Sequence, residues 1–293
     1  MSDYKFKIFI GWDSREDIAY QVCKQSLLSN CKYPEQLEIV PLKLKDLQKK
    51  EHYTRQVDPL ASTEFTFSRF LIPHLCDYEG WALFIDCDFL YMDDVRKLFQ
   101  ERDDRYAVMC AQHDYRPAEG TKMDGQTQHI YPRKNWSSMV LWNCGHRSNR
   151  ACNKELVNNP DISGAYMHRF SWLADKEIGA ISHEWNWLVG WYKEPMDGKP
   201  RALHYTEGGP WFKETQKCEY AVDWMLMEQR YQKIKMREEK HREAGAFENL
   251  SEETEQFLLD CLQYKVDPEG NFYKKDIEHI KRKVEKDMGK VAA

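Results

Sequence analysis

The chain of 293 residues has no long apolar run and no excess of charge of either sign. Its first apolar stretch, residues 8–10, is followed at once by Gly-Trp-Asp, so neither a signal peptide nor a transmembrane helix is predicted. The 43 Lys and Arg residues nearly balance the 48 Asp and Glu residues, which gives a formal net charge of -5. A generally basic nucleic-acid-binding protein is therefore excluded, because binding to phosphates needs an excess of positive charge.

The nine cysteines are odd in number and form no Cys-x-x-Cys pair, so a disulfide framework is not indicated. A zinc site built from Cys144, His146 and Cys152 would lack the usual ligand spacing. We therefore expect reduced, mostly buried thiols and a cytoplasmic protein with no transmembrane segment and no nucleic-acid partner.

What the chain does contain is enough apolar sequence for a large core, with 42% hydrophobic and 13% aromatic residues. Charge is unevenly distributed, because residues 213–293 hold 16 Lys or Arg and 18 Asp or Glu. That segment is about 42% charged, against about 27% for residues 1–212. We expect a main domain at residues 1–212 and a charged helical C-terminal extension at residues 213–293.

The main domain alternates short apolar strands with helical patterns. Strands are predicted at residues 6–10, 37–40, 81–85, 106–110, 138–142 and 202–205, and helices at residues 15–29 and 64–75. Such alternation in a chain of this size predicts an α/β fold with a mainly parallel central sheet flanked by helices.

The extension is predicted to be helical at residues 221–242, after a cap at Ser251 and at residues 274–286. A bundle docked on the main domain is favoured, because the apolar stripes of these helices need burial. Dimerisation through the same stripes is an alternative. Attachment to a membrane surface is less favoured, because Glu238 and Glu239 interrupt the basic face.

A long polar stretch with several prolines and glycines occupies residues 112–135. A loop of this length is either functional or an irregular insertion. We consider both an acceptor-binding or lid element and a solvated insertion.

The most informative motif is Asp-Cys-Asp at residues 86–88, directly after the apolar strand at residues 81–85. Open α/β sheets bind ligands at the carboxyl ends of their strands, and paired carboxylates there can hold a divalent cation that bridges phosphates. The alternative is structural: Asp86 ends the strand and Asp88 starts a turn.

Two enzyme classes place Asp-x-Asp after such a strand. Haloacid-dehalogenase-like phosphohydrolases have it near the N-terminus, with Thr or Val two positions after the second Asp. Here Leu90 occupies that position and two predicted strands come first. Nucleotide-sugar glycosyltransferases use both carboxylates for metal, and the surrounding sequence favours this class.

Six segments, in the right order, resemble the retaining glycosyltransferases of family 8, the glycogenin and galactosyltransferase group. They are residues 11–13 with 19–27, residues 66–73, residues 86–88 with 93–98, residues 136–143, residues 184–186, and residues 204–205 with 210–211. The resemblance extends over residues 5–212 and implies a GT-A fold, which is a Rossmann-like fold for nucleotide-diphospho-sugar transferases.

The resemblance implies that Asp86, Asp88 and His204 bind Mn²⁺ or Mg²⁺. It also implies that Trp12 and Asp13 lie near the nucleotide base, although Trp12 is equally well explained as a core residue.

Other positions would contact the donor. Arg69 would meet its phosphates or orient Asp86, the alternative being a surface charge on a helix. The small side chains of Ser137 and Ser138 would let the donor sugar approach. Gly208 and Gly209 would let the backbone approach the diphosphate.

The chain departs from the family pattern in two places. The family's phosphate-contacting Lys before Pro-Trp is Gly209 here. The family usually has a segment with an acidic residue and Gln before its Trp-Asn motif, and residues 168–175 stand in that place here. Asp175, with Glu184 behind it, is therefore the hypothesis for the catalytic residue on the reactive face of the sugar.

The sequence thus predicts a metal-dependent transferase that moves a hexosyl unit from a nucleoside-diphosphate sugar to a hydroxyl acceptor. By resemblance, the donor would be UDP-glucose or UDP-galactose and the anomeric configuration would be retained. The alternatives are a metal-dependent phosphohydrolase, a sugar-nucleotide pyrophosphorylase and a non-catalytic nucleotide-sugar-binding protein.

Overall fold

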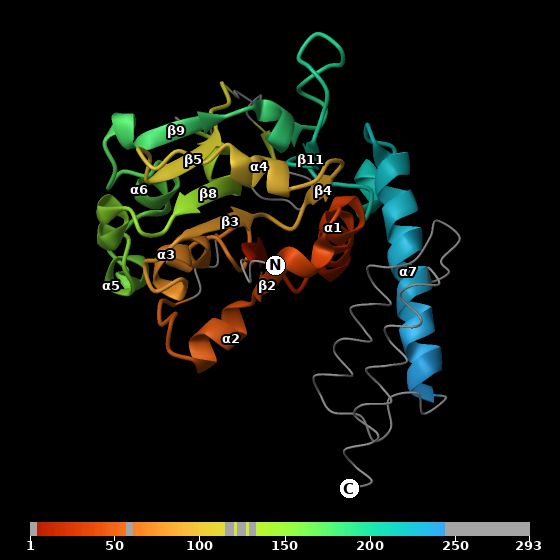
Figure 1. Cartoon of the computed structure of the whole chain (residues 1–293), viewed down its shortest axis with the longest axis horizontal. Helices are drawn as coiled ribbons and strands as arrows, with labels where there is room; N and C mark the ends of the chain where they lie inside the picture. The colour runs from red at the N-terminus through yellow and green to blue at the C-terminus, as the bar shows by residue number, and fades with distance from the viewer. Residues whose placement is uncertain (1–4, 57–60, 115–119, 122–126, 129–132, 244–293) are drawn as a thin grey trace, which may run out of the picture.

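The computed structural model describes residues 5–56, 61–114, 120–121, 127–128 and 133–243. Its central feature is a six-stranded sheet with the order β2-β1-β3-β8-β5-β9 (Figure 1). The strands are β1 (Phe6–Gly11), β2 (Leu37–Leu42), β3 (Trp81–Ile85), β5 (Val108–Ala111), β8 (Met139–Asn143) and β9 (Ile178–Ile181). Only β8 runs antiparallel to its neighbours β3 and β5, so the expected mainly parallel sheet is confirmed.

β3 lies in the middle of this sheet, and its residues after Trp81 are all buried. Ala82, Leu83, Phe84 and Ile85 are fully buried. Strands covered on both faces have continuous apolar sequences, which is why this segment shows no alternation with polar residues. Its position between β1 and β8 fixes the point at which the following residues leave the sheet.

The helices around the sheet are mostly short. They are α1 (Asp17–Asn30), α2 (Leu44–Lys49), α3 (Ile72–Leu75), α4 (Arg96–Gln100), α5 (Lys154–Asn158) and α6 (Gly164–His168). Helix α1 confirms the helix predicted at residues 15–29. The single helix predicted at residues 64–75 is wrong: turns lead into a 3-10 helix at Ser68–Leu71 and then into the four-residue α3.

A second sheet of three strands, in the order β10-β11-β4, joins distant parts of the chain. It consists of β4 (Phe89–Tyr91), β10 (Trp187–Leu188) and β11 (Ala202–His204). β4 and β11 pair antiparallel, with His204 opposite Phe89. This pairing brings the end of β11 next to the segment that follows β3. Within residues 112–135, a two-residue pair of strands, β6 (Gly120–Thr121) and β7 (Thr127–Gln128), is also described.

Helix α7 (Ala221–Glu243) confirms the helix predicted at residues 221–242 and lies beside α1 (Figure 1). Trp224 and Ile234 on one side of α7 are buried, whereas Val222 and Leu226 on the other side are exposed. The helices predicted further along the extension lie outside the described residues. Within the described part of the chain, no helix has both the length and the apolar character needed to span a membrane.

Candidate metal and donor site

The Asp-Cys-Asp motif leaves the sheet directly after β3 and ends where β4 begins. The backbone amide of Asp86 donates a hydrogen bond to the carbonyl of Ser138 at 2.9 Å, and the carbonyl of Asp88 accepts one from the amide of Tyr205 at 3.0 Å. The motif is therefore held on both sides, by the segment before β8 and by the residue after β11. This is the carboxyl end of a central strand, where open α/β sheets bind ligands.

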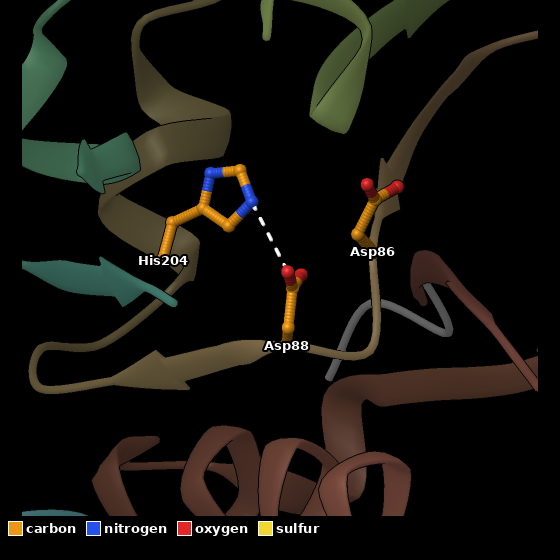
Figure 2. Close-up of side chains that lie close together, drawn as sticks. All are labelled: Asp86, Asp88 and His204. Atoms are coloured by element: carbon orange, nitrogen blue, oxygen red, sulfur yellow. Dashed lines mark ion pairs between the residues drawn. The ribbon is translucent and has the colours of Figure 1, made fainter. Parts of the chain in front are cut away.

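His204 completes a cluster with the two aspartates (Figure 2). Its ring stacks on Phe89, with centroids 4.5 Å apart and ring planes 14° apart, and its Nε2 lies 3.3 Å from Oδ2 of Asp88. One potential ligand atom from each of the three residues lies within 4.8 Å of the others. Two carboxylates and an imidazole are a donor set that suits Mn²⁺ or a similar divalent cation, so these residues fit the expected metal.

Arg69 lies behind the cluster and is itself buried. Its Nη1 donates to Oδ1 of Asp86 at 2.7 Å and to the carbonyl of Ser137 at 3.1 Å. Burial raises the pKa of Asp86 to about 6, with the nearby charge of Asp88 acting in the same direction and the guanidinium of Arg69 opposing both. A bound divalent cation would favour the ionised carboxylate by the same Coulombic effect as Arg69.

These residues face a cavity of about 170 Å³, which we call the central cavity. Seven of the residues predicted for the site line it: Arg69, Asp86, Asp88, Ser137, Ser138, His204 and Gly208. Gly208 has a φ of 106° and its amide donates to the carbonyl of Tyr205, so it forms a turn that glycine makes without strain.

Trp12 and Asp13 are not among the residues that line the central cavity. Asp13 is fully buried, and its carboxylate accepts hydrogen bonds from the side chain and amide of Arg15 and from the amide of Glu64. Trp12 is partly buried against the core, and its Nε1 donates to Asp17 at 2.8 Å. In this structure both residues organise the loop between β1 and α1.

Gly209 is covered by a side chain of its own segment. A Cβ atom added to Gly209 would lie 1.8 Å from Cζ3 of Trp211, so the indole ring occupies the space that a side chain would need. Trp211 in turn donates from Nε1 to Oε2 of Glu16 at 3.1 Å. The position that is Lys in the resembling family is thus closed to any larger residue unless Trp211 moves.

The two residues expected to act on the sugar do not line the central cavity. The side chain of Asp175 is 90% exposed and forms an ion pair with Arg133. Glu184 forms an ion pair with Arg201 at 3.3 Å and accepts a hydrogen bond from the amide of Lys199. The structure therefore does not bring Asp175 or Glu184 together with the metal-site residues.

Among the cavity residues that were not predicted as site residues, Glu16 and His168 have strongly shifted pKa values. Glu16 precedes α1, and burial raises its pKa to about 7, with the charges of Asp88 and Asp13 contributing. His168 ends α6 and its Nδ1 lies 2.7 Å from Oγ of Ser137; burial lowers its pKa to about 3, so its imidazole is neutral. These two residues are identified by their shifted pKa values in the folded protein, and the sequence contains no motif for either.

Comparisons with known proteins support the fold. No family model matches the chain. The apo structure of the bifunctional glycosyltransferase WbbM aligns with a TM-score of 0.56 at 15% identity, over 78% of this chain and 50% of WbbM. The glycosyltransferase GlyE of Streptococcus pneumoniae TIGR4 aligns with a TM-score of 0.51 at 16% identity, over 77% of this chain and 60% of GlyE. The chain thus spans only about half to three fifths of these proteins, and it has the GT-A fold.

A much closer likeness is found at the level of sequence. The chain is 52% identical to Protein CDI of Arabidopsis thaliana over 237 residues. The match covers 80% of this chain and 90% of the Arabidopsis protein. An identity this high over most of both chains shows common descent, and the chain belongs to the family of Arabidopsis thaliana Protein CDI.

Proposed function

We propose that this protein is a metal-dependent glycosyltransferase of the family 8 type. It transfers a hexosyl unit from a nucleoside-diphosphate sugar to a hydroxyl acceptor, with retention of the anomeric configuration. The observation that carries this proposal is the Asp86, Asp88 and His204 cluster, which lies in the central cavity at the carboxyl edge of a GT-A sheet. WbbM and GlyE, which share the fold, are glycosyltransferases, and this supports the proposal.

In this proposal, Asp86, Asp88 and His204 would hold Mn²⁺ or Mg²⁺, and the cation would supply a Lewis acid for the charge that develops on the leaving diphosphate. Arg69 keeps the carboxylate of Asp86 in place through its 2.7 Å hydrogen bond. The small side chains of Ser137 and Ser138 form the wall beside the cluster, and the turn at Gly208 brings backbone to the cavity.

The structure changes the prediction for the catalytic residue on the reactive face of the sugar, because neither residue predicted for this role lines the central cavity. An oxocarbenium-like transition state favours a nearby carboxylate or dipole. Among the residues that the structure describes, the carboxylates that line the central cavity apart from the metal cluster are Glu16 and Glu207. We propose these two residues, in place of Asp175 and Glu184, as the groups to examine first.

UDP-glucose or UDP-galactose is the proposed donor and the cytoplasm the proposed location, both from the sequence alone. The decisive experiment incubates the protein with Mn²⁺ and a panel of UDP-sugars and GDP-sugars and measures release of nucleoside diphosphate. Turnover of one donor, abolished by a chelator, supports the transferase even without an acceptor. Release of phosphate from simple monoesters would instead support a phosphohydrolase, and donor binding without turnover a non-catalytic protein.

Asp88→Asn is the matching variant, and we expect it to lose roughly 100-fold or more of the metal-dependent activity while remaining folded. Asp103→Asn is its control, because Asp103 pairs with Arg105 and does not line the central cavity. Full activity of Asp88→Asn would show that the metal assignment is wrong.

A further inference from the structure

Behind His204, a chain of buried side chains leads away from the metal cluster. Nδ1 of His204 lies 2.8 Å from Oδ1 of Asn186, and Nδ2 of Asn186 lies 2.9 Å from Oγ of Ser138. Oγ of Ser138 lies 2.7 Å from the carbonyl oxygen of Asn135. Asn186 is fully buried, and Ser138 and His204 are 3% and 2% exposed, so solvent does not compete for these hydrogen bonds.

The direction of every hydrogen bond in this chain follows from its far end. A carbonyl oxygen only accepts, so the hydroxyl of Ser138 donates to Asn135 and accepts from Asn186. The amide nitrogen of Asn186 is the donor to Ser138, and its oxygen therefore faces His204. That oxygen can only accept, so Nδ1 of His204 carries a proton.

The consequence for the metal cluster concerns the opposite side of the ring. With the proton on Nδ1, a neutral imidazole has its lone pair on Nε2, the atom that lies 3.3 Å from Asp88. The lone pair thus points to the two carboxylates, as metal ligation requires. Partners behind a ligating histidine typically fix its tautomer and orientation in this way.

We infer that Asn186 is a positioning residue, which holds His204 in the Nδ1–H tautomer and so prepares Nε2 to bind the divalent cation. This inference rests on the proposed function. Asn186 itself does not line the central cavity. The series of hydrogen bonds that orients its amide ends at Asn135, which does line the cavity. Asn135 adopts a left-handed backbone conformation, with φ of 64°. Because the carbonyl of Asn135 accepts from Ser138, the same series of hydrogen bonds holds the wall of the cavity and the candidate metal ligand.

The imidazole of His113 also interacts with Asn186. It is neutral, because burial lowers its pKa to about 3, and its Nδ1 lies 2.8 Å from the hydroxyl of Tyr192. The side chain of His113 therefore brings no positive charge to Asn186.

The test measures binding of Mn²⁺ alone to the metal-free chain of 293 residues, by electron paramagnetic resonance, without nucleotide. Asn186→Asp keeps an acceptor for Nδ1–H, so we expect Mn²⁺ affinity within about 3-fold of the wild type. Asn186→Leu has similar size but no acceptor, and we expect roughly 10-fold to 100-fold weaker binding. Asn149→Leu is the control: Asn149 is also fully buried, but its amide donates only to the carbonyls of Ala107 and Asn143.

The order of the two variants separates positioning from packing. If Asn186 only filled space, the buried charge of Asn186→Asp would be more disruptive than the apolar Asn186→Leu, and that order in Mn²⁺ affinity would overturn the inference. Wild-type affinity in Asn186→Leu would also overturn it, while leaving the proposed function intact. A wild-type protein that binds no Mn²⁺ would contradict the proposed metal site itself.

A milder variant serves if Asn186→Leu does not fold. Ser138→Ala removes the group that orients the amide of Asn186, which is then free to turn its nitrogen toward His204. We expect Mn²⁺ binding to weaken a few-fold, in the same direction as Asn186→Leu. Unchanged binding in Ser138→Ala would overturn the inference.

Discussion

The guanidinium of Arg69 joins two segments of the site, because one nitrogen donates both to Asp86 at 2.7 Å and to the carbonyl of Ser137 at 3.1 Å. Arg69 is 5% exposed, so its interpretation as a surface charge on a helix is wrong. It belongs to a 3-10 helix whose neighbouring residues Ser68 and Phe70 are also buried. The first carboxylate of the candidate metal site is therefore held by an ion pair with a buried arginine.

Arg69→Met should be severely destabilising, because it leaves the largely buried carboxylate of Asp86 without its cation. Loss of one partner of a buried pair costs about 3 to 5 kcal/mol of unfolding free energy, measured by urea denaturation. Arg69→Lys keeps the charge but not the planar geometry, so a smaller loss is expected. Equal stabilities of the two variants would contradict a Coulombic role for Arg69.

Gly209→Ala should displace the indole ring of Trp211, since the new Cβ would lie 1.8 Å from it. We expect a loss of about 1 to 3 kcal/mol in unfolding free energy and a change in tryptophan fluorescence, because the ring must leave its contact with Glu16. Gly145→Ala is the control, since its nearest atom would be at an ordinary 3.6 Å. Identical stabilities of the two variants would refute the steric argument.

Glu16→Gln should change how stability depends on pH. The pKa of Glu16 is raised from 4.5 to about 7 in the folded protein, so the folded state favours the neutral carboxyl. Its contribution to stability is fully present below about pH 4.5 and is lost as the pH rises through about 7.

Without metal, we therefore expect the wild type to lose about 3 kcal/mol relative to Glu16→Gln between pH 4.5 and pH 7.5. Urea denaturation in the presence of a chelator measures this difference. Glu79→Gln, at an exposed position, controls for the general loss of a carboxylate. Stability curves for the wild type and Glu16→Gln that stay parallel would show that Glu16 titrates normally.

Trp224→Ala tests whether α7 is an integral part of the folded domain. Trp224 is 3% exposed and lies 5.3 Å from the ring of Trp211, so we expect its removal to cost about 3 to 5 kcal/mol in a single cooperative transition. Leu226→Ala, on the exposed face of the same helix, should change stability by less than about 0.5 kcal/mol. A small effect of Trp224→Ala would mean that α7 unfolds separately from the sheet.

Long and strongly patterned elements were predictable from the sequence, and short ones were not. Buried apolar runs identified β3 and β8, and helical spacing identified α1 and α7. The helices α4, α5 and α6 have five residues each, which is too short for a period to be visible. The segment at residues 64–75 has apolar residues at helical spacing, but it forms turns, a buried 3-10 helix and a four-residue helix, so apolar spacing alone did not distinguish these from one long helix.

The residues of the candidate site also include some that the sequence could predict and some that it could not. Asp86 and Asp88 are adjacent in sequence to a recognisable strand, so the motif could be found directly. Glu16 and Trp211 are 195 residues apart, and their hydrogen bond exists only because β11 and the segment after it return to the start of α1. Asp175 and Glu184 were chosen for their residue type and order, and the folded chain directs both to ion pairs outside the cavity.

The sequence by itself determined the α/β class, the central strands and the carboxylate pair, because each depends on residues that are close together in the chain. The family resemblance also predicted His204 and Arg69, but only the tertiary structure decided by which contacts these distant side chains meet that pair. The antiparallel pairing of β4 with β11 places His204 beside Asp88, and the buried chain through Asn186 and Ser138 sets the direction of its ring. Such contacts depend on strand register and on hydrogen-bond satisfaction in the interior, and neither is encoded in any local pattern of residues.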